Sequence, residues 1–170
     1  MAPTAPTDGS QSANYDSRPA TYEHIAAVRT LMLRAALELI RRAHEHDASK
    51  LVSPEVEVFD RVTPLLKTLV YDSPEYRASL EDMGPALAHH YAANQHHPEY
   101  WPNGIADMSL VDLIEMTCDW MAAAGRTKDG DVLKSIRSIN AARFGYAPGG
   151  ELATALENTV AELSGPTLPV

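Results

Sequence analysis

Apolar residues recur at three- and four-residue steps along most of the chain, which is the spacing of one face of an α-helix. The stretch from Thr21 to Ser49 contains neither Gly nor Pro, so one amphipathic helix is expected there. His46 occupies the next position on the apolar face after Ala43. No segment alternates between apolar and polar residues for long enough to predict a strand. The earlier apolar positions on this helix are Ile25, Val28, Met32, Ala36 and Leu39.

Short motifs divide the remaining chain into further helices. Two Ser-Pro-Glu strings, at residues 53–55 and 73–75, join an N-cap residue to a first-turn proline and an acid that complements the helix dipole. Pro98 ends a helix, Ser109 opens the next one and Gly125 closes it. The expected helices cover 21–49, 53–71 with a kink at Pro64, 73–83, 85–97, 109–124, 131–144 and 151–163, with a loop over 99–108.

The chain has the length and composition of one helical domain. It holds 170 residues, of which 45% are hydrophobic and only 6% aromatic, a composition typical of helix packing. Residues 1–19 carry almost no side chains to bury and are predicted to form a disordered tail. We therefore expect a single compact all-α domain of about six to seven helices over 20–164, followed by a C-terminal tail over 165–170.

Charge and cysteine content limit the partners and the compartment. The net charge of −9 and the scattered 14 basic residues argue against general nucleic-acid binding. Cys118 is the single cysteine, which excludes an internal disulfide framework and suits a reducing cytosol. No apolar run reaches the roughly 20 residues of a membrane span, and no secretory signal opens the chain. A cytoplasmic protein without membrane contacts is expected, and a homodimer is the base-rate expectation for a small helical protein.

The seven histidines are the most informative residues, because they fall in three places only. His24 stands alone, His44 and His46 end the first long helix, and four more lie between residues 89 and 97. In a helix over that last segment, His90, Asn94 and His97 share one face, and His89 shares the neighbouring face with His96. Imidazole is the commonest protein ligand for transition metals, so this cluster predicts a metal or catalytic site.

Carboxylates stand near these histidines in the expected structure. Asp47 directly follows His46, and Asp119 lies on the helix that Ser109 opens, with Glu115 one turn before it. Carboxylates complete a histidine site with negative charge. The alternatives are ordinary ones: a hydrogen-bonded core pair or solvated helix end for the histidines, and a solvated face for Glu115 and Asp112.

The string HDASKL at residues 46–51 resembles the signature of the HD-domain metal-dependent phosphohydrolase superfamily. That resemblance implies an HD-domain-like fold in which His46, Asp47 and Asp119 bind one divalent ion. His90 and His97 would complete a site for a second ion. The lysine of the signature, Lys50, would then offset the charge of a substrate phosphate; the alternatives are an ion pair with Glu55 or an ordinary surface position.

A closer resemblance, over residues 22–158, is to an uncharacterised family of phage and bacterial proteins. It rests on the strings HDxSK at residues 46–50, HYxxNxHHPE at residues 90–99 and DW at residues 119–120, with a glutamate at Glu55. The resemblance implies membership of that family without implying a reaction. If the chain is encoded by a phage, its expected compartment is the cytoplasm of the host.

One feature departs from the HD pattern. His24 and His46 are 22 residues apart with no helix breaker between them, which places them about 33 Å apart in a continuous helix. Either the helix breaks near Arg34 or His24 is not a metal ligand, and we favour the second interpretation. His44 is expected to be exposed.

The leading hypothesis is a phosphohydrolase that acts on a nucleotide or another small phosphoester with one or two divalent ions, either Mn, Fe, Co, Ni or Zn. A di-iron oxygenase and a non-enzymatic helical adaptor or inhibitor, in which a His/Asp network fixes helix register, are the alternatives. The residues expected to serve the site form three sets. The ligands are His46, Asp47, His90, His97 and Asp119, with His24, His96 and Glu115 as weaker candidates; the catalytic candidates are Lys50, Glu55, His89 and Glu99; the substrate-binding candidates are Lys50, Asn94 and Tyr91.

Overall fold

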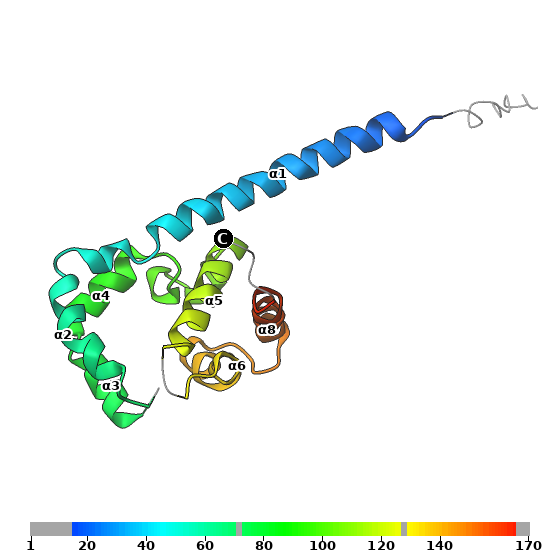
Figure 1. Ribbon diagram of the computed structural model, residues 1–170. Coiled ribbons are helices and arrows are strands. Elements are labelled where there is room, and N and C mark those ends of the chain that lie inside the picture. Colours follow the sequence, from blue (N-terminus) through cyan, green and yellow to red (C-terminus); the bar gives the residue numbers. More distant parts are fainter. Residues whose placement is uncertain (1–14, 71–72, 127–128, 166–170) are drawn as a thin grey trace, which may run out of the picture. The chain divides into compact units, whose positions relative to one another are not determined.

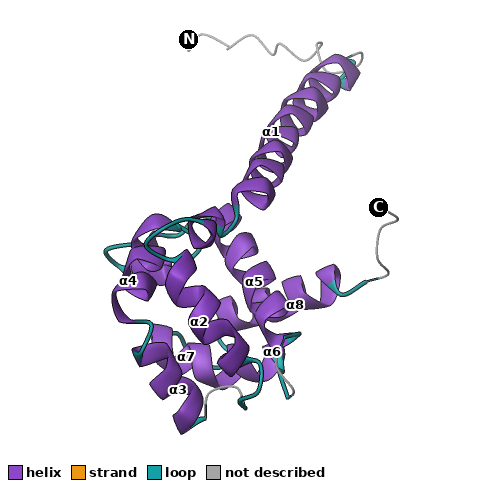
Figure 2. Ribbon diagram, turned by 60° about the vertical axis from the view of Figure 1, so that its left-hand side comes forward, coloured by secondary structure: helices purple, strands orange, loops and turns teal. Residues whose placement is uncertain are grey.

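The computed structural model describes residues 15–70, 73–126 and 129–165 of the chain. Over these residues the secondary structure is helical and contains no strand, which confirms the all-α class (Figure 2). Most of the two predicted tails, residues 1–14 and 166–170, lies outside the described residues. None of the helices in the described ranges is long and apolar enough to span a bilayer.

The chain divides into two compact units, residues 1–38 and residues 39–170. The first helix, α1 (Arg18–Glu45), runs across this division without a break at Arg34. It begins three residues before the predicted Thr21, and none of its residues is buried. The limits of the predicted domain, 20–164, stay a prediction.

The C-terminal unit holds the remaining helices, which form two groups (Figure 1). One group consists of α2, α3 and α4 with the 3₁₀ turn η1; the other packs α5 against α6, α8 and a π-helical turn. These elements are η1 (Ala48–Leu51), α2 (Val56–Leu66), α3 (Pro74–Glu81), α4 (Gly84–Ala93), η2 (Pro98–Tyr100), η3 (Gly104–Asp107), α5 (Leu110–Ala124), α6 (Val132–Lys134), the π turn η4 (Ser135–Asn140), α7 (Ala141–Phe144) and α8 (Glu151–Leu163).

Several helix ends follow the local signals in the sequence. The Ser73 hydroxyl accepts a hydrogen bond from the backbone N–H of Tyr76, as an N-cap residue does. Ser109 and Asp112 form a reciprocal capping box at the start of α5, and Gly125 is its C-cap. The last helix, α8, has the predicted bounds.

Several predicted helix limits are wrong: the helix expected over 21–49 ends at Glu45, and the helix expected to reach residue 71 ends at Leu66. The helix expected to reach His97 ends at Ala93, because Asn94 adopts an extended conformation and its side-chain amide donates to the carbonyl of His90 at 2.7 Å. Ser53 is not an N-cap residue. The helix begins at Val56 instead, after the backbone N–H of Glu55 bonds to the Val52 carbonyl at 3.1 Å.

The main apolar core fixes how α5 is oriented. Met116 of α5 packs with Ile136 of the π turn and with three residues of α8, and all of them are buried. Glu115 and Asp119 of the same helix both lie near His46 at the end of α1. The α8 residues of the core are Ala153, Leu156 and Val160.

Candidate metal centre

Asp47 lies in the turn between α1 and η1, with a left-handed backbone conformation at φ 57°. Aspartate tolerates this region better than most residues do. Its Oδ2 atom accepts a hydrogen bond from Lys50 Nζ at 2.5 Å. Its Oδ1 atom is buried and has no hydrogen-bond partner among the described residues. An unpaired buried carboxylate oxygen is costly, so this atom calls for a positively charged or hydrogen-donating group.

Three histidines direct their Nε2 atoms at the same place as Asp47 Oδ1. The distance from this oxygen is 3.3 Å to His90 Nε2 and 3.6 Å to His96 Nε2. His97 Nε2 lies 2.9 Å from His90 Nε2. Within the described part of the chain, His96 Nε2 is the second buried side-chain atom without a hydrogen-bond partner.

These spacings fit the donor atoms of a single metal ion. Four ligands at about 2.1 Å from an ion in a tetrahedral arrangement are about 3.4 Å from one another. The four donor atoms of Asp47, His90, His96 and His97 all lie within 4.8 Å of one another. The donor set of three imidazoles and one carboxylate suits Zn, Fe, Mn, Co or Ni.

A second group of ligands shares Asp47 with the first. His46 Nε2 lies 3.6 Å from Asp47 Oδ2 and 3.7 Å from Asp119 Oδ1, so these three residues also form a group able to hold an ion. Asp47 thus directs one oxygen toward each group. This arrangement places a carboxylate between two candidate ion positions.

The other ring nitrogens of these histidines are held by carboxylates. His90 Nδ1 lies 2.9 Å from Glu55 Oε2, while Glu115 Oε1 lies 2.9 Å from His46 Nδ1 and 3.2 Å from His96 Nδ1. A carboxylate on the far nitrogen fixes the ring and its tautomer, and it is a regular feature of metal-bound histidines. His46, His96 and Glu115 also lie close enough together to hold an ion. Their hydrogen-bond spacing indicates that Glu115 orients the two rings.

Glu55 is the most deeply buried acid of the site, with 0% of its surface exposed. Besides His90, its carboxylate contacts Ser49 Oγ at 3.0 Å and His89 Nδ1 at 2.7 Å. Asn94 donates to the same Ser49 hydroxyl at 2.8 Å. Glu55 therefore joins η1, the start of α2 and both α4 histidines in one polar network.

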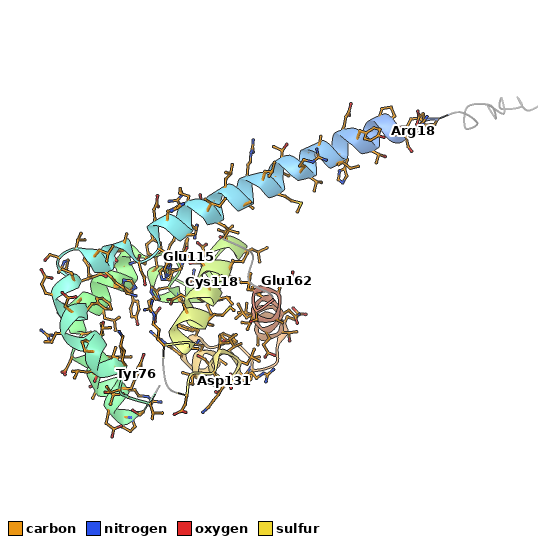
Figure 3. The ribbon with its side chains drawn as sticks, in the orientation of Figure 1. Arg18, Tyr76, Glu115, Cys118, Asp131 and Glu162 are labelled. Carbon is orange, nitrogen blue, oxygen red and sulfur yellow. The ribbon has the colours of Figure 1, made fainter. Side chains whose placement is uncertain are left out.

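Arg42 supports the network from the last turns of α1. Its guanidinium donates to Asp112 Oδ1 at 2.5 Å and to Glu115 Oε2 at 3.2 Å. Arg42, Asp112 and Glu115 are all at most 12% exposed at their side chains. Figure 3 shows Glu115 on α5 beside the C-terminal end of α1. These two contacts of Arg42 fix α5 against the last turns of α1, which also carry His46.

The environment sets the protonation states of the cluster without an ion. Asp119 and Glu115 raise the pKa of His46 to about 10. Burial, reinforced by the neighbouring His96 and His90, lowers the pKa of His97 to about 2. Burial also lowers the pKa of His90. At neutral pH His90 and His97 are neutral and ready to coordinate, whereas His46 carries a proton that a metal ion must displace.

The two acids that face His46 remain ionised. Burial alone would raise the pKa of Glu115, but hydrogen bonds from His46 and His96 outweigh it and hold this pKa well below its usual range. Burial alone would also raise the pKa of Asp119, but the interaction with His46 outweighs it, so this pKa is lowered overall. The cluster is therefore rich in negative charge, as a cation site requires.

An apolar cavity of about 290 Å³ opens beside the second ligand group. Its walls come from the end of α1 and from α5, and Figure 3 marks Glu115 and Cys118 on this stretch of α5. A smaller cavity of about 110 Å³ lies on the other side of His46, next to Gln95 and His96. The larger cavity is lined by Leu39, Arg42, Ala43, His46, Glu115, Cys118, Asp119 and Ala122.

The structure brings together most of the predicted site. All five leading ligands lie in the two groups, and His96 and Glu115, the weaker candidates, are also part of the cluster. His24 is exposed in the N-terminal unit and belongs to none of the ligand groups found among the described residues. His44 is exposed, as expected.

The four clustered histidines do not lie on one continuous helix, so their predicted placement is wrong. His97 meets His90 from the turn after α4, and His96 turns inward beside them while His89 contacts Glu55. The segment leaves the helix at Asn94, so the expected sharing of a face by His89 and His96 does not occur. His96, with 2% of its surface exposed, is a central member of the cluster.

The remaining candidates lie around the cluster. Lys50 pairs with Asp47 and not with Glu55, and its Nζ lies 5.1 Å from the centre of the Phe59 ring. Glu99 pairs with Arg143, which donates to the Tyr91 hydroxyl at 2.9 Å. Arg42 and Arg143 are two further residues of this region that were not predicted from the sequence. Arg42 precedes His46 by one helical turn, and this spacing is the signal in the sequence that could have identified it.

Comparison with known proteins identifies a family for this chain but no reaction. The model of a family of unknown function, DUF5662, matches residues 13–164. No curated protein and no solved structure matches the chain.

Proposed function

The chain belongs to the DUF5662 family, and we propose that it is a metal-dependent phosphohydrolase that acts on a nucleotide or another small phosphoester. The proposed site has an HD-domain-like set of ligands and takes up to two divalent ions. Asp47, His90, His96 and His97 would hold the first ion, and His46, Asp47 and Asp119 the second.

The observation that carries the proposal is the pair of unsatisfied atoms at the centre of the cluster. Asp47 Oδ1 and His96 Nε2 are buried, lack hydrogen-bond partners among the described residues and lie 3.6 Å apart. Buried polar atoms in native proteins are almost always satisfied by protein, water or an ion. The carboxylates behind the rings favour an ion, because a purely structural network would not need each Nε2 atom directed at one point.

Bound divalent ions supply Lewis acidity toward a phosphoryl oxygen and lower the pKa of water. The chain's own residues would do the rest. Lys50 beside Asp47 adds a positive charge for the phosphoryl group, and Glu55 and Glu115 hold the histidines in place. His89, which contacts Glu55 and is 47% exposed at its side chain, is the histidine of this network that solvent reaches most easily.

The cavity beside His46 supports a small substrate with an uncharged organic part. Its volume of about 290 Å³ is close to the lower end of the range for small-molecule sites, about 300–1,000 Å³. The side chains of Leu39, Ala43 and Ala122 give it apolar walls, and His46 and Asp119 also line it. A nucleobase or a similar flat group fits these walls better than a chain of further phosphates does.

Metal content of the purified full-length protein tests the site. We expect one or two Mn, Fe, Co, Ni or Zn ions per chain by mass spectrometry, and less than about one tenth of that in Asp47→Asn and His96→Gln. His44→Gln, which changes an exposed histidine two residues before His46, is the matched control and should keep its ions. A wild-type protein that neither contains nor takes up these ions would refute the metal site.

Activity is measured on the metal-loaded protein with p-nitrophenyl phosphate and a panel of nucleoside 5′-monophosphates. Phosphate release should fall more than about 100-fold in Asp47→Asn and remain in His44→Gln. A metal-loaded wild type that releases no phosphate from any member of the panel would contradict the hydrolase. Two irons per chain together with oxygen consumption would instead assign the site to a di-iron oxygenase.

A further inference from the structure

The N-terminal part of α1 exposes a large apolar surface. Within the N-terminal unit, seven large apolar side chains of α1 are between 39% and 69% exposed. Helices in folded proteins normally bury at least one apolar stripe, yet this helix has no buried residue. In Figure 3 its side chains project on all sides of the ribbon. The seven residues are Tyr22, Ile25, Val28, Leu31, Met32, Leu33 and Leu37.

The size of this surface is at the upper end of what a monomer usually leaves in water. A helical segment over 22–38 is about 25 Å long and about 11 Å across with its side chains, which gives a lateral surface on the order of 850 Å². Eleven of its 17 residues are apolar, which in proportion gives an apolar surface of about 550 Å². Monomers rarely expose more than a few hundred Å² in one patch, and a stable dimer buries about 800 Å² on each partner.

One stripe of this surface has the spacing of a coiled-coil seam. Ile25, Val28, Met32 and Ala35 follow one another at steps of three, four and three residues, the pattern of heptad positions a and d. No charged residue interrupts the stripe. Thr30 and Arg34 lie on the other side of the helix. Two copies of such a stripe can meet without bringing like charges together in the seam.

We propose that a second copy of this chain covers this surface, with the two α1 helices paired along the Ile25, Val28, Met32 and Ala35 seam. Every copy carries the same uncharged stripe, so an isologous interface is available wherever the protein is present. The seam uses only part of the apolar area of about 550 Å² per chain, so the interface is smaller than the standard one of about 800 Å² per partner, and we expect a dimer that dissociates in the micromolar range. The seam lies in the N-terminal unit, whereas both ligand groups lie in the C-terminal unit.

Sedimentation equilibrium of the full-length protein between 1 and 100 µM tests the pairing. We expect a species of twice the 18.5 kDa chain mass for wild type. A double variant, Val28→Glu with Met32→Glu, should have the mass of one chain over the same range. The matched control, Thr30→Glu with Arg34→Glu, introduces the same residues on the polar side and should remain dimeric.

Helix content and metal content of each variant separate lost pairing from lost folding. The Val28→Glu and Met32→Glu protein should keep its C-terminal unit, seen as an unchanged metal stoichiometry relative to wild type. A wild type that is monomeric at 100 µM would overturn the proposal, as would a double variant that still dimerises. Co-sedimentation of a monomeric wild type with phosphatidylcholine vesicles would also overturn it and assign the surface to lipid.

Discussion

The histidine cluster and the N-terminal part of α1 depart from the usual distribution of side chains in opposite ways. In the cluster, His90 and His96 are 1% and 2% exposed, and two buried polar atoms have no hydrogen-bond partner in the described part of the chain. In α1, Met32 is 68% exposed and apolar side chains face water. Polar burial without a partner and apolar exposure both cost free energy, so each region indicates a partner of its own chemistry.

The difference lies in what kind of partner each region needs. The cluster offers converging nitrogen and oxygen atoms with net negative charge, which an ion of about 1 Å radius satisfies. The α1 seam offers a row of uncharged side chains without any convergent polar atom, which another helix satisfies. A bound ion would act through a few strong bonds, and a paired helix would act through many weak contacts. Removing one atom should therefore disrupt the site, whereas the seam should need charge on several turns.

The largest effect is expected on removal of the ions. Without them, the buried donor atoms of Asp47 and His96 lose their compensation, and the free energy of unfolding should fall by about 4 kcal/mol for an ion supplied at 1,000 times its Kd. For a protein of this size that is a fall of roughly 8 to 16 °C in Tm. Differential scanning calorimetry with and without EDTA measures it. An Asp47→Asn protein should show no response to EDTA, and an unresponsive wild type would contradict the prediction.

Loss of the Glu55 carboxylate, which contacts the Nδ1 atoms of His89 and His90, should weaken metal binding less than loss of a ligand does. Glu55→Gln leaves His90 in place but supplies an amide where two imidazoles need an acceptor, so metal affinity should fall by about 10- to 100-fold. Competition with a fluorescent chelator measures the Kd. Glu57→Gln changes an exposed acid in the first turn of the same helix and should leave the Kd unchanged. Equal Kd values for the two variants would show that Glu55 does not position the rings.

The pH dependence of metal binding should report the proton on His46. The raised pKa, about 10, means that charged His46 stabilises the metal-free protein fully below about pH 6.5 and that this contribution disappears as the pH rises through about 10. Metal binding displaces that proton, so its affinity should rise about tenfold per pH unit between pH 7 and 9.

Two substitutions define the contribution of His46 to that slope. In His46→Gln the affinity should be weaker but flat with pH over the same range, because His90 and His97 are already neutral there. His44→Gln, the exposed neighbour, should keep the wild-type slope. A slope of one that persists in His46→Gln would assign the displaced proton to another residue.

The parts of the fold that follow local rules could be predicted from the sequence. Ser73, Ser109 and Gly125 mark helix ends through contacts with their own chain neighbours, and all three are where the sequence places them. The end of α4 depends on Asn94, whose amide bonds to the His90 carbonyl and to the Ser49 hydroxyl. Ser49 lies 45 residues before Asn94 in the chain. Helical spacing alone does not reveal this contact, and it predicted a helix that continues to His97.

The candidate site shows the same limit. Asp47 and His90 could be named from their residue types and order, because metal chemistry selects few side chains. The position of His96 depends on the turn after α4, and its orientation depends on Glu115 of α5. Arg42 and Arg143 act through pairs with acids at least 44 residues away. Such pairs are set by packing between helices, which one sequence does not specify.

The smallest expected effect tests which face of α1 pairs. Leu37 follows Val28 by nine residues, two and a half helical turns, and so lies on the opposite face although its side chain is 65% exposed. Leu37→Gln should therefore change the dimer dissociation constant by less than about twofold, an effect within the range of ordinary surface substitutions. Met32→Gln, an equal loss of apolar surface on the seam, should weaken the dimer several-fold in the same sedimentation experiment. Equal weakening by both would mean that the helix is covered on two sides, and the assembly would then need more than one α1 partner for each chain.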